Sequence, residues 1–348
     1  MVVGSLRETA ESVSRWFEKH RRNLPWRKTS DPYAIWVSEV MLQQTQVSTV
    51  IPYYERFLTR FPNVKALAES PEEKVLAHWA GLGYYSRAKN LRRGAQFLLE
   101  NHQGRFPRSR DEILKVPGIG PYTAGAVLSI AFDLKEPLVD GNVERVFSRY
   151  FALELPIDSP QAKRFFWEKA DALVQQCTSA RIFNQGLMEL GSLICTKSSP
   201  QCGRCPLISS CAAHKKKLVD QLPFKKNKTQ YKELHQLKLL FEKSGKIWLR
   251  KNTEKEWWSG LWDFPTTPLK NPRKWISEVE GQAKAVGAIS WRELSHQKHT
   301  VTHHRLQIIP VHLKVKKAPS KGGKWVPVKE IPALPVSALV KKIMLQDF

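Results

Sequence analysis

The sequence lacks any uninterrupted run of about eighteen apolar residues, the length that a membrane-spanning helix needs. Its first residues also lack a charged segment followed by an apolar core, which is the arrangement of a secretory signal peptide. Acidic side chains are few, because 32 Asp and Glu stand against 56 Lys and Arg and give a formal net charge of +24. These absences predict a cytoplasmic protein with no membrane partner and a basic surface.

Cysteine is also scarce, with five residues in 348, and the first of them is Cys177. The other four have the spacing Cys195-x6-Cys202-x2-Cys205-x5-Cys211, which fits a metal site in a reducing compartment better than a disulfide framework. Four thiolates in a compact loop can hold zinc or an iron–sulfur cluster. Structural zinc usually shows two C-x2-C pairs, whereas only one is present here. We expect Cys177, which lies in a helical pattern, to be a buried small side chain.

The positive charge is concentrated toward the C-terminus. Residues 1–211 carry 28 basic and 21 acidic side chains, whereas residues 212–348 carry 28 and 11. This excess favours a polyanionic partner, because each Lys or Arg that neutralises a phosphate releases a condensed counterion. A basic surface that is merely solvated is the alternative. With 42% hydrophobic residues, the chain is long enough to form two or three domains.

The residue pattern divides the chain into two regions. Helical periodicity predicts helices at residues 5–23, from 32, at about 49–60, 71–80, 84–100 and 109–115, from 123, and at 142–152, 159–176 and 180–194. Residues 212–230 are polar and Lys-rich and predict a linker. Beyond residue 231, alternating runs predict strands near 237–240, 247–250, 306–315 and 325–328, with helices near 272–280 and 336–346. The sequence therefore predicts a mainly α region followed by a small α/β domain.

Pro117, Gly118 and Gly120 interrupt an otherwise apolar stretch and predict two helices joined by a tight hairpin. The start of the second helix would present free backbone N–H groups, which suit a phosphate. Asp140 follows twenty residues after Gly120, so we expect a carboxylate close to the bound phosphodiester. Taken separately, the glycines are also typical of a generic helix connection, and Asp140-Gly141-Asn142 is typical of a turn.

Glu39 stands among apolar neighbours in the helix that starts at residue 32. A carboxylate in such a place is costly unless it is paired or takes part in chemistry. Burial would raise its pKa, as a general acid at neutral pH requires. The alternative is that Glu39 lies on a solvated face of the helix.

Several polar and aromatic residues could contact a base. Trp26 and Arg27 follow a helix break and could form either a platform for a base or an ordinary packing corner. Gln43 and Gln44 end the helix that starts at residue 32. They could insert between base pairs of a duplex, or they could simply be exposed to solvent. Tyr84 follows a turn with two glycines. Its aromatic ring could insert into a duplex or could only pack against the rest of the protein.

These stretches and the cysteine loop occur in the order typical of DNA base-excision glycosylases. The chain resembles the helix-hairpin-helix superfamily of those enzymes and, within it, the MutY adenine glycosylases. The similarity is dense from about Leu24 to Cys211 and loose beyond. The stretches that carry it are Leu24–Arg27, Val37–Val47, Gly81–Tyr85, Pro117–Thr123, Val139–Val143 and the cysteine loop.

The resemblance implies that Glu39 protonates adenine N7 and later activates water, and that Asp140 stabilises or covalently traps the oxocarbenium sugar. Two carboxylates of different pKa suit this bond, because the leaving purine must become neutral while the cationic sugar needs a negative charge. Adenine must first be flipped out of the duplex. The resemblance further implies sugar contacts by Tyr122 and Asn142, adenine contacts by Trp26, Arg27 and Gln185, and insertion of Gln44 and Tyr84 into the duplex.

The cysteine spacing resembles the [4Fe–4S] loop of the endonuclease III and MutY families, so a [4Fe–4S] cluster is implied. Duplex DNA with adenine opposite 8-oxoguanine or guanine is the implied partner of a monomeric, nucleoid-associated protein. Endonuclease III-like lyases carry a lysine two residues after the second hairpin glycine, where this chain has Tyr122. The difference predicts a monofunctional glycosylase with little β-lyase activity.

Trp257–Pro265 is similar to a segment of Nudix (MutT-like) domains, but Lys274–Ala285 lacks the Glu-rich pattern with which Nudix enzymes bind metal. We therefore expect this domain to recognise a lesion rather than to hydrolyse a nucleotide. Family members recognise 8-oxoguanine with a Phe-Ser-His segment, and the aligned residues here are Val301, Thr302 and His303. Because Val lacks the aromatic ring, we expect a weaker preference for 8-oxoguanine over guanine.

The resemblance implies four segments: an iron–sulfur domain from residues 1–29 and 136–211, a six-helix domain at 30–135, a linker at 212–230 and a MutT-like domain at 231–348. Two other functions fit the residues. One is a pyrimidine-damage or mismatch glycosylase-lyase of the same superfamily. The other is a non-catalytic DNA-binding scaffold with a four-cysteine metal site.

Overall fold

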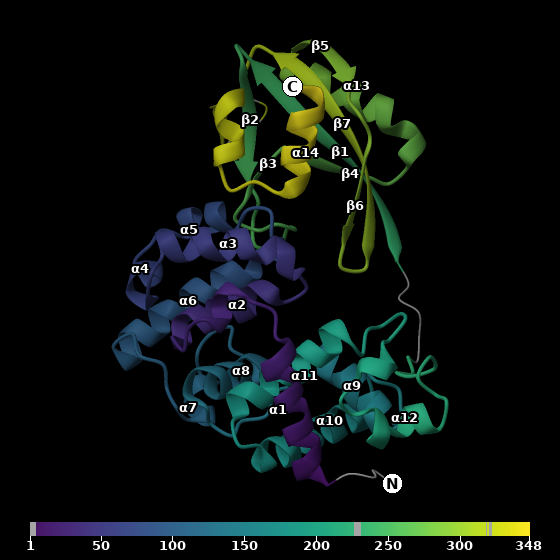
Figure 1. Ribbon diagram of the computed structural model, residues 1–348. Helices are drawn as coiled ribbons and strands as arrows, with labels where there is room; N and C mark the ends of the chain where they lie inside the picture. Colours follow the sequence, from purple (N-terminus) through teal and green to yellow (C-terminus); the bar gives the residue numbers. More distant parts are fainter. Residues whose placement is uncertain (1–4, 226–230, 318, 320–321) are drawn as a thin grey trace. The chain divides into compact units, whose positions relative to one another are not determined.

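The computed structural model describes residues 5–225, 231–317, 319 and 322–348, which form two compact units (Figure 1). The helical unit comprises the described residues of 1–69 and 90–228. The sheet unit comprises those of 70–89 and 229–348. Each unit buries its own apolar clusters, as separate domains do.

The helical unit confirms the mainly α region that periodicity predicted. Its α-helices are α1 (Leu6–His20), α2 (Pro32–Leu42), α3 (Val47–Arg60), α4 (Val64–Ala68), α6 (Ser86–His102, which begins in the sheet unit), α7 (Arg110–Ile113), α8 (Pro121–Phe132), α9 (Gly141–Tyr150), α10 (Pro160–Gln176), α11 (Ala180–Leu193) and α12 (Ala212–Lys215). Three 3-10 turns are η1 (Pro25–Arg27), η2 (Cys202–Arg204) and η3 (Ile208–Ser210). The short helices α4 and α12 were not predicted.

Short polar side chains set where the helices begin. Asp31 accepts hydrogen bonds from the backbone N–H groups of Tyr33 at 3.1 Å and Ala34 at 3.3 Å, so α2 starts at the following proline. Ser159 and Ser179 accept equivalent bonds at the starts of α10 and α11. The polar residues that precede these helical patterns in the sequence are therefore N-caps in the structure.

Helices α2 and α8 pack against each other inside the helical unit. Residues 33–41 of α2 and 123–131 of α8 are all buried, as expected for helices that are apolar on every side. Gly125 allows a close approach, because a Cβ there would lie 2.0 Å from the carbonyl oxygen of Pro137. This contact holds the strand-like segment that leads to Asp140 against α8.

The hairpin between α7 and α8 confirms the helix-hairpin-helix. Gly118 has a φ of +83°, and a Cβ there would lie 2.7 Å from the Cβ of Asn90. Only glycine meets both conditions without strain. Gly120 precedes α8 at its N-cap, and nothing lies within 4 Å of the position that a Cβ would take. The start of α8 is thus open to a close-fitting group.

The sheet unit confirms the α/β domain. Its strands are β1 (Lys232–Lys243), β2 (Lys246–Lys251), β3 (Trp262–Asp263), β4 (Thr266–Leu269), β5 (Ala288–Glu293), β6 (Gln297–Val301), β7 (His304–Val315) and β8 (Gly323–Pro327). Its helices are α5 (Glu72–Trp79), α13 (Trp275–Val286) and α14 (Ala338–Asp347), with 3-10 turns η4 (Pro272–Lys274) and η5 (Val328–Ala333). The strand order is β3-β2-β1-β7-β5, with β4 paired to β1, β6 to β7 and β8 to β2; β1 and β7 are parallel.

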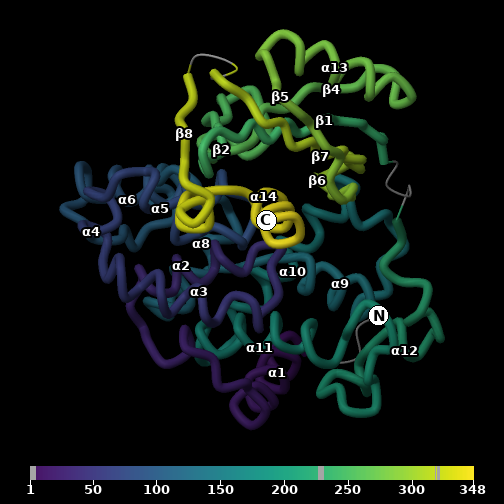
Figure 2. The backbone as a smooth tube through the Cα atoms, turned by 90° about the horizontal axis from the view of Figure 1, so that it is seen from above, coloured from purple at the N-terminus to yellow at the C-terminus, as the bar shows by residue number. Residues whose placement is uncertain are grey.

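One helix covers each face of this sheet. Leu239 and Phe241 of β1 share an apolar cluster with Val279 of α13, whereas Leu240 shares one with Ile343 of α14. The alternation follows from the two-residue period of a strand. Figures 1 and 2 show α13 and α14 on opposite sides of the strands. The short strands β3, β4, β5 and β6 were not predicted.

The predicted linker at 212–230 is in part folded. Helix α12 lies within it, and Leu222 is buried in a small cluster with Ala152 and Ala213 of the helical unit. Residues 226–230 lie outside the described residues. Among the residues that the structure describes, no helix has both the length and the apolar character to cross a membrane.

Candidate active site

Glu39 lies on the buried helix α2, and its side chain is only 4% exposed. The hydroxyl of Tyr122, from α8, donates a hydrogen bond to its Oε2 atom. Burial raises the pKa of Glu39 to about 7, while the Tyr122 hydrogen bond lowers it, nearby Asp140 raises it and Arg27 lowers it. The solvated helix face that was the alternative is therefore wrong, and the carboxyl can carry a proton at neutral pH.

Asp140 is the N-cap of α9. Its carboxylate accepts hydrogen bonds from the backbone N–H of Val143 at 2.8 Å and of Asn142 at 2.9 Å, and from the Asn142 side-chain amide at 2.9 Å. Burial raises the pKa of Asp140, and the three N–H donors and the charge of Arg145 act against this rise. Arg145 also donates to Asn142 Oδ1 at 2.9 Å, so the amide is held in place.

The structure brings Glu39, Tyr122 and Asp140 together, although they come from three separate helices. The pKa of Tyr122 is raised well above its ordinary value by burial and by the negative charges of Glu39 and Asp140. Tyr122 therefore stays a hydrogen-bond donor. Its hydroxyl also lies 3.4 Å from the Sδ atom of Met188, on α11. Two carboxylates and a neutral phenol thus share one site.

Trp26, Arg27 and Gln185 meet at a cavity of about 280 Å³. The Trp26 ring is buried and packs edge-on against Tyr54 at a centroid distance of 5.4 Å. The Gln185 amide donates to the carbonyl of Arg181 at 3.1 Å. The lining is completed by Phe17, Arg21, Lys28, Thr29, Ser30, Ile130, Arg181 and Ile182.

Sequence reasoning missed Glu189, which is 1% exposed and forms ion pairs with Arg22 and Arg27. Its two oxygens accept from Arg27 Nη1 at 2.8 Å and Nη2 at 2.9 Å. A lone Glu in the apolar pattern of α11 carries the same signal of a costly buried carboxylate that drew attention to Glu39. The partners could not be found in that way, because they lie 162 and 167 residues away.

The residues predicted to enter the duplex lie on turns. Gln43 Nε2 donates to Thr123 Oγ1 at 3.4 Å, and the exposed Gln44 has a φ of +58°. Tyr84 belongs to the sheet unit, has a φ of +47° and is 46% exposed. The Arg87 guanidinium lies 5.6 Å from the centre of its ring. Positive φ in non-glycine residues marks turns that the surrounding structure holds in a costly conformation.

The four cysteines of the loop line one small cavity of about 30 Å³. Arg149 lines it as well and donates from Nη1 to Cys195 Sγ at 3.4 Å. Burial and the neighbouring thiols raise the pKa of Cys205 to about 12, so a positively charged group would be needed to hold four thiolates here. Among the described residues, no three His, Cys, Asp or Glu side chains are grouped to hold a single metal ion. Cys177 is buried, as predicted.

Thr302 and His303 form the exposed turn between β6 and β7 in the sheet unit. Thr302 has a φ of +50° and donates to the carbonyl of Val301 at 2.8 Å. On the flanking strands, His304 contacts Trp257 at a ring distance of 5.4 Å and His299 contacts Trp258 at 5.6 Å. The two indoles thus support the hairpin that carries the predicted lesion-contacting residues.

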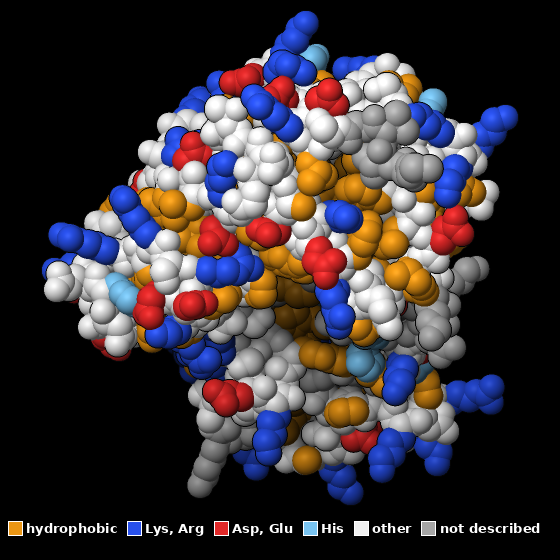
Figure 3. Space-filling model, turned by 90° about the horizontal axis from the view of Figure 1, so that it is seen from below, with side chains coloured by type: hydrophobic (Ala, Val, Ile, Leu, Met, Phe, Trp, Pro, Cys, Tyr) orange, Lys and Arg blue, Asp and Glu red, His pale blue; other side chains and the backbone are white. Residues whose placement is uncertain are grey.

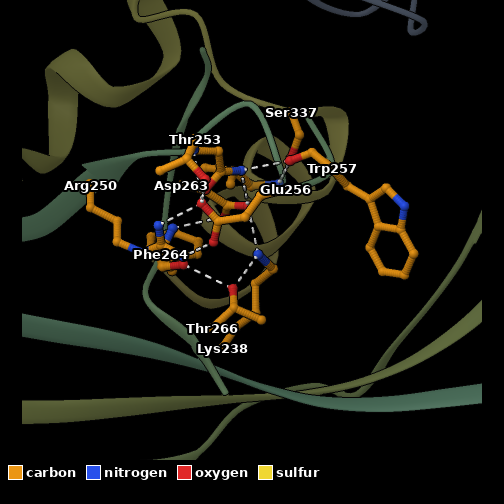
Figure 4. A network of polar contacts seen from close by, with 11 residues as sticks. Lys238, Arg250, Thr253, Glu256, Trp257, Asp263, Phe264, Thr266 and Ser337 are labelled. Carbon is orange, nitrogen blue, oxygen red and sulfur yellow. Dashed lines mark hydrogen bonds and ion pairs between the residues drawn. The ribbon is translucent and has the colours of Figure 1, made fainter. Parts of the chain in front are cut away.

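A buried polar network fixes the segment that carries these indoles. Lys238 Nζ, on β1, donates to Asp263 Oδ2 at 2.7 Å and to Thr266 Oγ1 at 2.9 Å (Figure 4). Asn252 donates to the carbonyl of Trp257 at 3.0 Å and lies 3.4 Å from Asp263. These hydrogen bonds hold the Nudix-like segment against β1 and the residues that follow β2.

Two family descriptions match the chain. Residues 37–171 match the HhH-GPD superfamily of base excision DNA repair proteins. Residues 237–346 match the NUDIX domain. The first match lies in the helical unit except for residues 70–89, and the second lies in the sheet unit.

Known proteins are similar over most of the chain. An adenine DNA glycosylase of Buchnera aphidicola subsp. Schizaphis graminum is 34% identical over 343 residues, which cover 96% of this chain and 97% of that protein. A solved structure of a thermostable thymine-DNA glycosylase has a TM-score of 0.55 and 31% identity, over 61% of this chain and 97% of its own. A trapped endonuclease III–DNA covalent intermediate has a TM-score of 0.51 and 25% identity, over 61% and 97%.

Proposed function

The chain belongs to the adenine DNA glycosylases of base-excision repair, and from this premise we propose that it removes adenine paired with 8-oxoguanine or guanine, using Glu39 and Asp140. The observation that carries the proposal is the meeting of these two carboxylates at one site with Tyr122. Burial raises the pKa of Glu39 to about 7, so it can donate a proton at neutral pH.

In this reaction the bond between the sugar C1′ and adenine N9 breaks, and both electrons leave with the base. Glu39 gives its proton to adenine N7, so that the departing purine is neutral. Asp140 then faces the cationic sugar, and Glu39 as carboxylate takes a proton from the water that completes hydrolysis. The three N–H donors to Asp140 favour its charged form, which supports this division of roles.

Adenine must leave the stack to reach these groups, which costs a few kcal/mol. We propose that Trp26, Arg27 and Gln185 receive it in the cavity that they line. Gln43 and Gln44 at the end of α2, and Tyr84, would fill or border the space left in the duplex. Backbone N–H groups after Gly118 and Gly120 at the open start of α8 suit a phosphate.

Binding to DNA follows from family membership, and the charge of this chain supports it. The formal net charge is +24, and Figure 3 shows Lys and Arg side chains projecting around the outline of one face. Such a surface adds salt-dependent affinity for any duplex. We propose that the protein acts as a monomer associated with the nucleoid.

The opposite base is proposed to be recognised by Thr302 and His303 at the tip of the β6–β7 hairpin. Val301 takes the place of an aromatic residue in this segment, and this supports a reduced preference for 8-oxoguanine over guanine. The sheet unit is thereby assigned to lesion recognition. The described residues of Lys274–Ala285 lack the acidic pattern of a Nudix hydrolase, which agrees with that assignment.

The cysteine loop fits a [4Fe–4S] cluster, which we propose as the resident cofactor. Cys195, Cys202, Cys205 and Cys211 line one cavity, and each thiolate of such a cluster binds a different iron. A zinc ion would instead need all four sulfurs within about 2.3 Å of one point. When bound, the cluster supplies positive charge that holds four thiolates and stabilises the loop, as metal binding commonly does.

A monofunctional activity is proposed because Tyr122 occupies the position of the lyase lysine. The competing glycosylase-lyase is favoured by one finding, the likeness to the trapped endonuclease III–DNA covalent intermediate. Trapping with borohydride on abasic DNA distinguishes the two, because only an amine nucleophile forms a reducible Schiff base. A strong covalent adduct would exclude the monofunctional activity and favour the glycosylase-lyase.

The decisive experiment measures single-turnover release of adenine from duplexes that pair it with 8-oxoguanine, guanine or cytosine, for the wild type and Glu39→Gln. We expect release opposite the first two and a loss of about 10²- to 10⁴-fold in the variant. Equal rates opposite all three bases would remove the mismatch proposal. A variant as active as the wild type would exclude Glu39 as the acid. A wild type that binds these duplexes without releasing adenine would favour the non-catalytic scaffold.

A further inference from the structure

Glu189 is an almost fully buried carboxylate that holds two arginines. Arg22 donates from its backbone N–H at 3.1 Å, from Nε at 2.9 Å and from Nη2 at 2.5 Å. Arg27 donates from both Nη atoms at 2.8 and 2.9 Å. Burial raises the pKa of Glu189, but the bonds from the two arginines outweigh it and lower the pKa to about 2. Glu189 is therefore ionised throughout the pH range in which an enzyme works.

The clamp fixes Arg27 in both position and orientation. The planar guanidinium meets the carboxylate through two parallel bonds, which define its plane. It also donates to the carbonyl of Arg22 at 3.2 Å and lies 5.0 Å from the centre of the Phe17 ring. The Arg27 side chain is only 12% exposed, yet it lines the cavity with Trp26.

The charge on Arg27 acts on Glu39. Three charged or titratable groups influence Glu39 from the elements around α2: Tyr122 on α8, Asp140 at the start of α9, and Arg27 on η1. Tyr122 and Arg27 favour the carboxylate form, whereas Asp140 favours the protonated form. Arg21, Lys28 and Arg181 add further positive charge to the cavity lining. An unbalanced guanidinium at this place would favour loss of the proton that the acid must carry.

We propose that Glu189 is a positioning residue for adenine removal: it holds Arg27 against the cavity and offsets part of the positive charge there, so that Glu39 keeps its proton. The inference rests on the proposed role of Glu39 as the acid. A purely structural role explains less, because well-packed apolar residues commonly replace a buried ion pair without loss of stability. The carboxylate is thus assigned a second task, which is to set the pH range of the reaction.

The test compares pH–rate profiles for adenine release by the wild type, Glu189→Gln and Arg22→Gln in single turnover. In Glu189→Gln the midpoint of the fall in rate at high pH should move down by about one unit, because the cation beside Glu39 is no longer balanced. At pH 8 the rate of the variant, scaled to its own maximum, should then be about tenfold below the equally scaled rate of the wild type. Arg22→Gln removes the other partner of Glu189, so it should cost stability while leaving the midpoint in place.

A second variant keeps the test valid if Glu189→Gln fails to fold. Arg27→Gln removes the cation itself, so the midpoint should move upward, opposite to the shift expected for Glu189→Gln. Rates that fall equally at every pH in these variants would overturn the inference and leave Glu189 a structural residue. If Glu39→Gln itself retains activity, the proposed acid fails as well, so the two failures are distinguishable.

Discussion

Tyr122 donates its hydroxyl hydrogen to Glu39, 83 residues earlier in the chain, at the point where α8 crosses the buried helix α2. The bond joins a phenol that cannot ionise at neutral pH to a carboxyl that titrates near pH 7. A donor to one carboxyl oxygen leaves the other oxygen to carry the transferable proton. The pair therefore links the hairpin helix to the acid chemistry.

The first prediction concerns this bond. Tyr122→Phe removes a donor that favours the carboxylate, so the pKa of Glu39 should rise and the fall in rate should move to higher pH. The measurement is the pH profile of adenine release, scaled to the maximum of each protein. Tyr150→Phe is the matched control, because its buried hydroxyl bonds to Thr9 at 2.8 Å. An unchanged midpoint in Tyr122→Phe would contradict the assignment of the acid.

The second prediction concerns stability. The folded-state pKa of Glu39 is raised from 4.5 to about 7, so folding binds a proton between these values and this contribution to stability is lost as pH rises through them. Glu39→Gln has no such proton, and at pH 8 it should be more stable than the wild type by about 3 kcal/mol, from 1.36 kcal/mol per pKa unit. Denaturant unfolding at pH 4 and pH 8 measures the difference, which should vanish at the lower pH. A constant difference would refute it.

The third prediction separates the two tasks of Asp140. Asn caps helices about as well as Asp, so Asp140→Asn should keep the start of α9 and the thermal stability. Adenine release should nevertheless fall at least about a hundredfold, because the negative charge facing the sugar is gone. Ser159→Asn at the cap of α10 is the control and should keep full activity. Equal activity in the two variants would rule out a chemical role for Asp140.

The fourth prediction concerns the cysteine loop. Cys205→Ser should lose the visible absorbance of an iron–sulfur cluster, its bound iron and part of its stability, since the loop relies on the bound group. Cys177→Ala changes a buried thiol outside the loop and should keep all three. Zinc rather than iron in the purified wild type, measured by elemental analysis, would show the cofactor proposal to be mistaken.

The fifth prediction concerns the lesion. Val301→Phe with Thr302→Ser restores the segment found in the family and should raise the ratio of adenine release opposite 8-oxoguanine to that opposite guanine. Val301→Leu enlarges the side chain without a ring and serves as control. A wild type that already discriminates as strongly as the double variant would show that the ring at position 301 is not needed.

Local signals made much of the fold predictable. The hairpin at Gly118 and Gly120 and the burial of α2 follow from patterns within a few residues, and both are present. Strands such as β5 and β6 escaped prediction because their short segments gain order only by pairing with β7.

The site was predictable in its residue types rather than in its contacts. Glu39 and Asp140 could be singled out by chemistry, but their approach depends on the packing of helices about a hundred residues apart. The clamp at Glu189 could not be derived at all, because nothing near Arg22 or Arg27 in the sequence indicates their partner. Long-range pairing of charges leaves no local periodic pattern.

The hydrogen bond from the Trp262 indole to Glu73, at 2.6 Å, limits how early the sheet unit can fold during synthesis. The two residues are 189 positions apart, and both belong to the sheet unit. At roughly 5–20 residues per second, a ribosome adds the second partner about ten to forty seconds after the first. Helix α5 is made early but must wait for this late neighbour, so the sheet unit cannot finish assembling until its last strands have been translated.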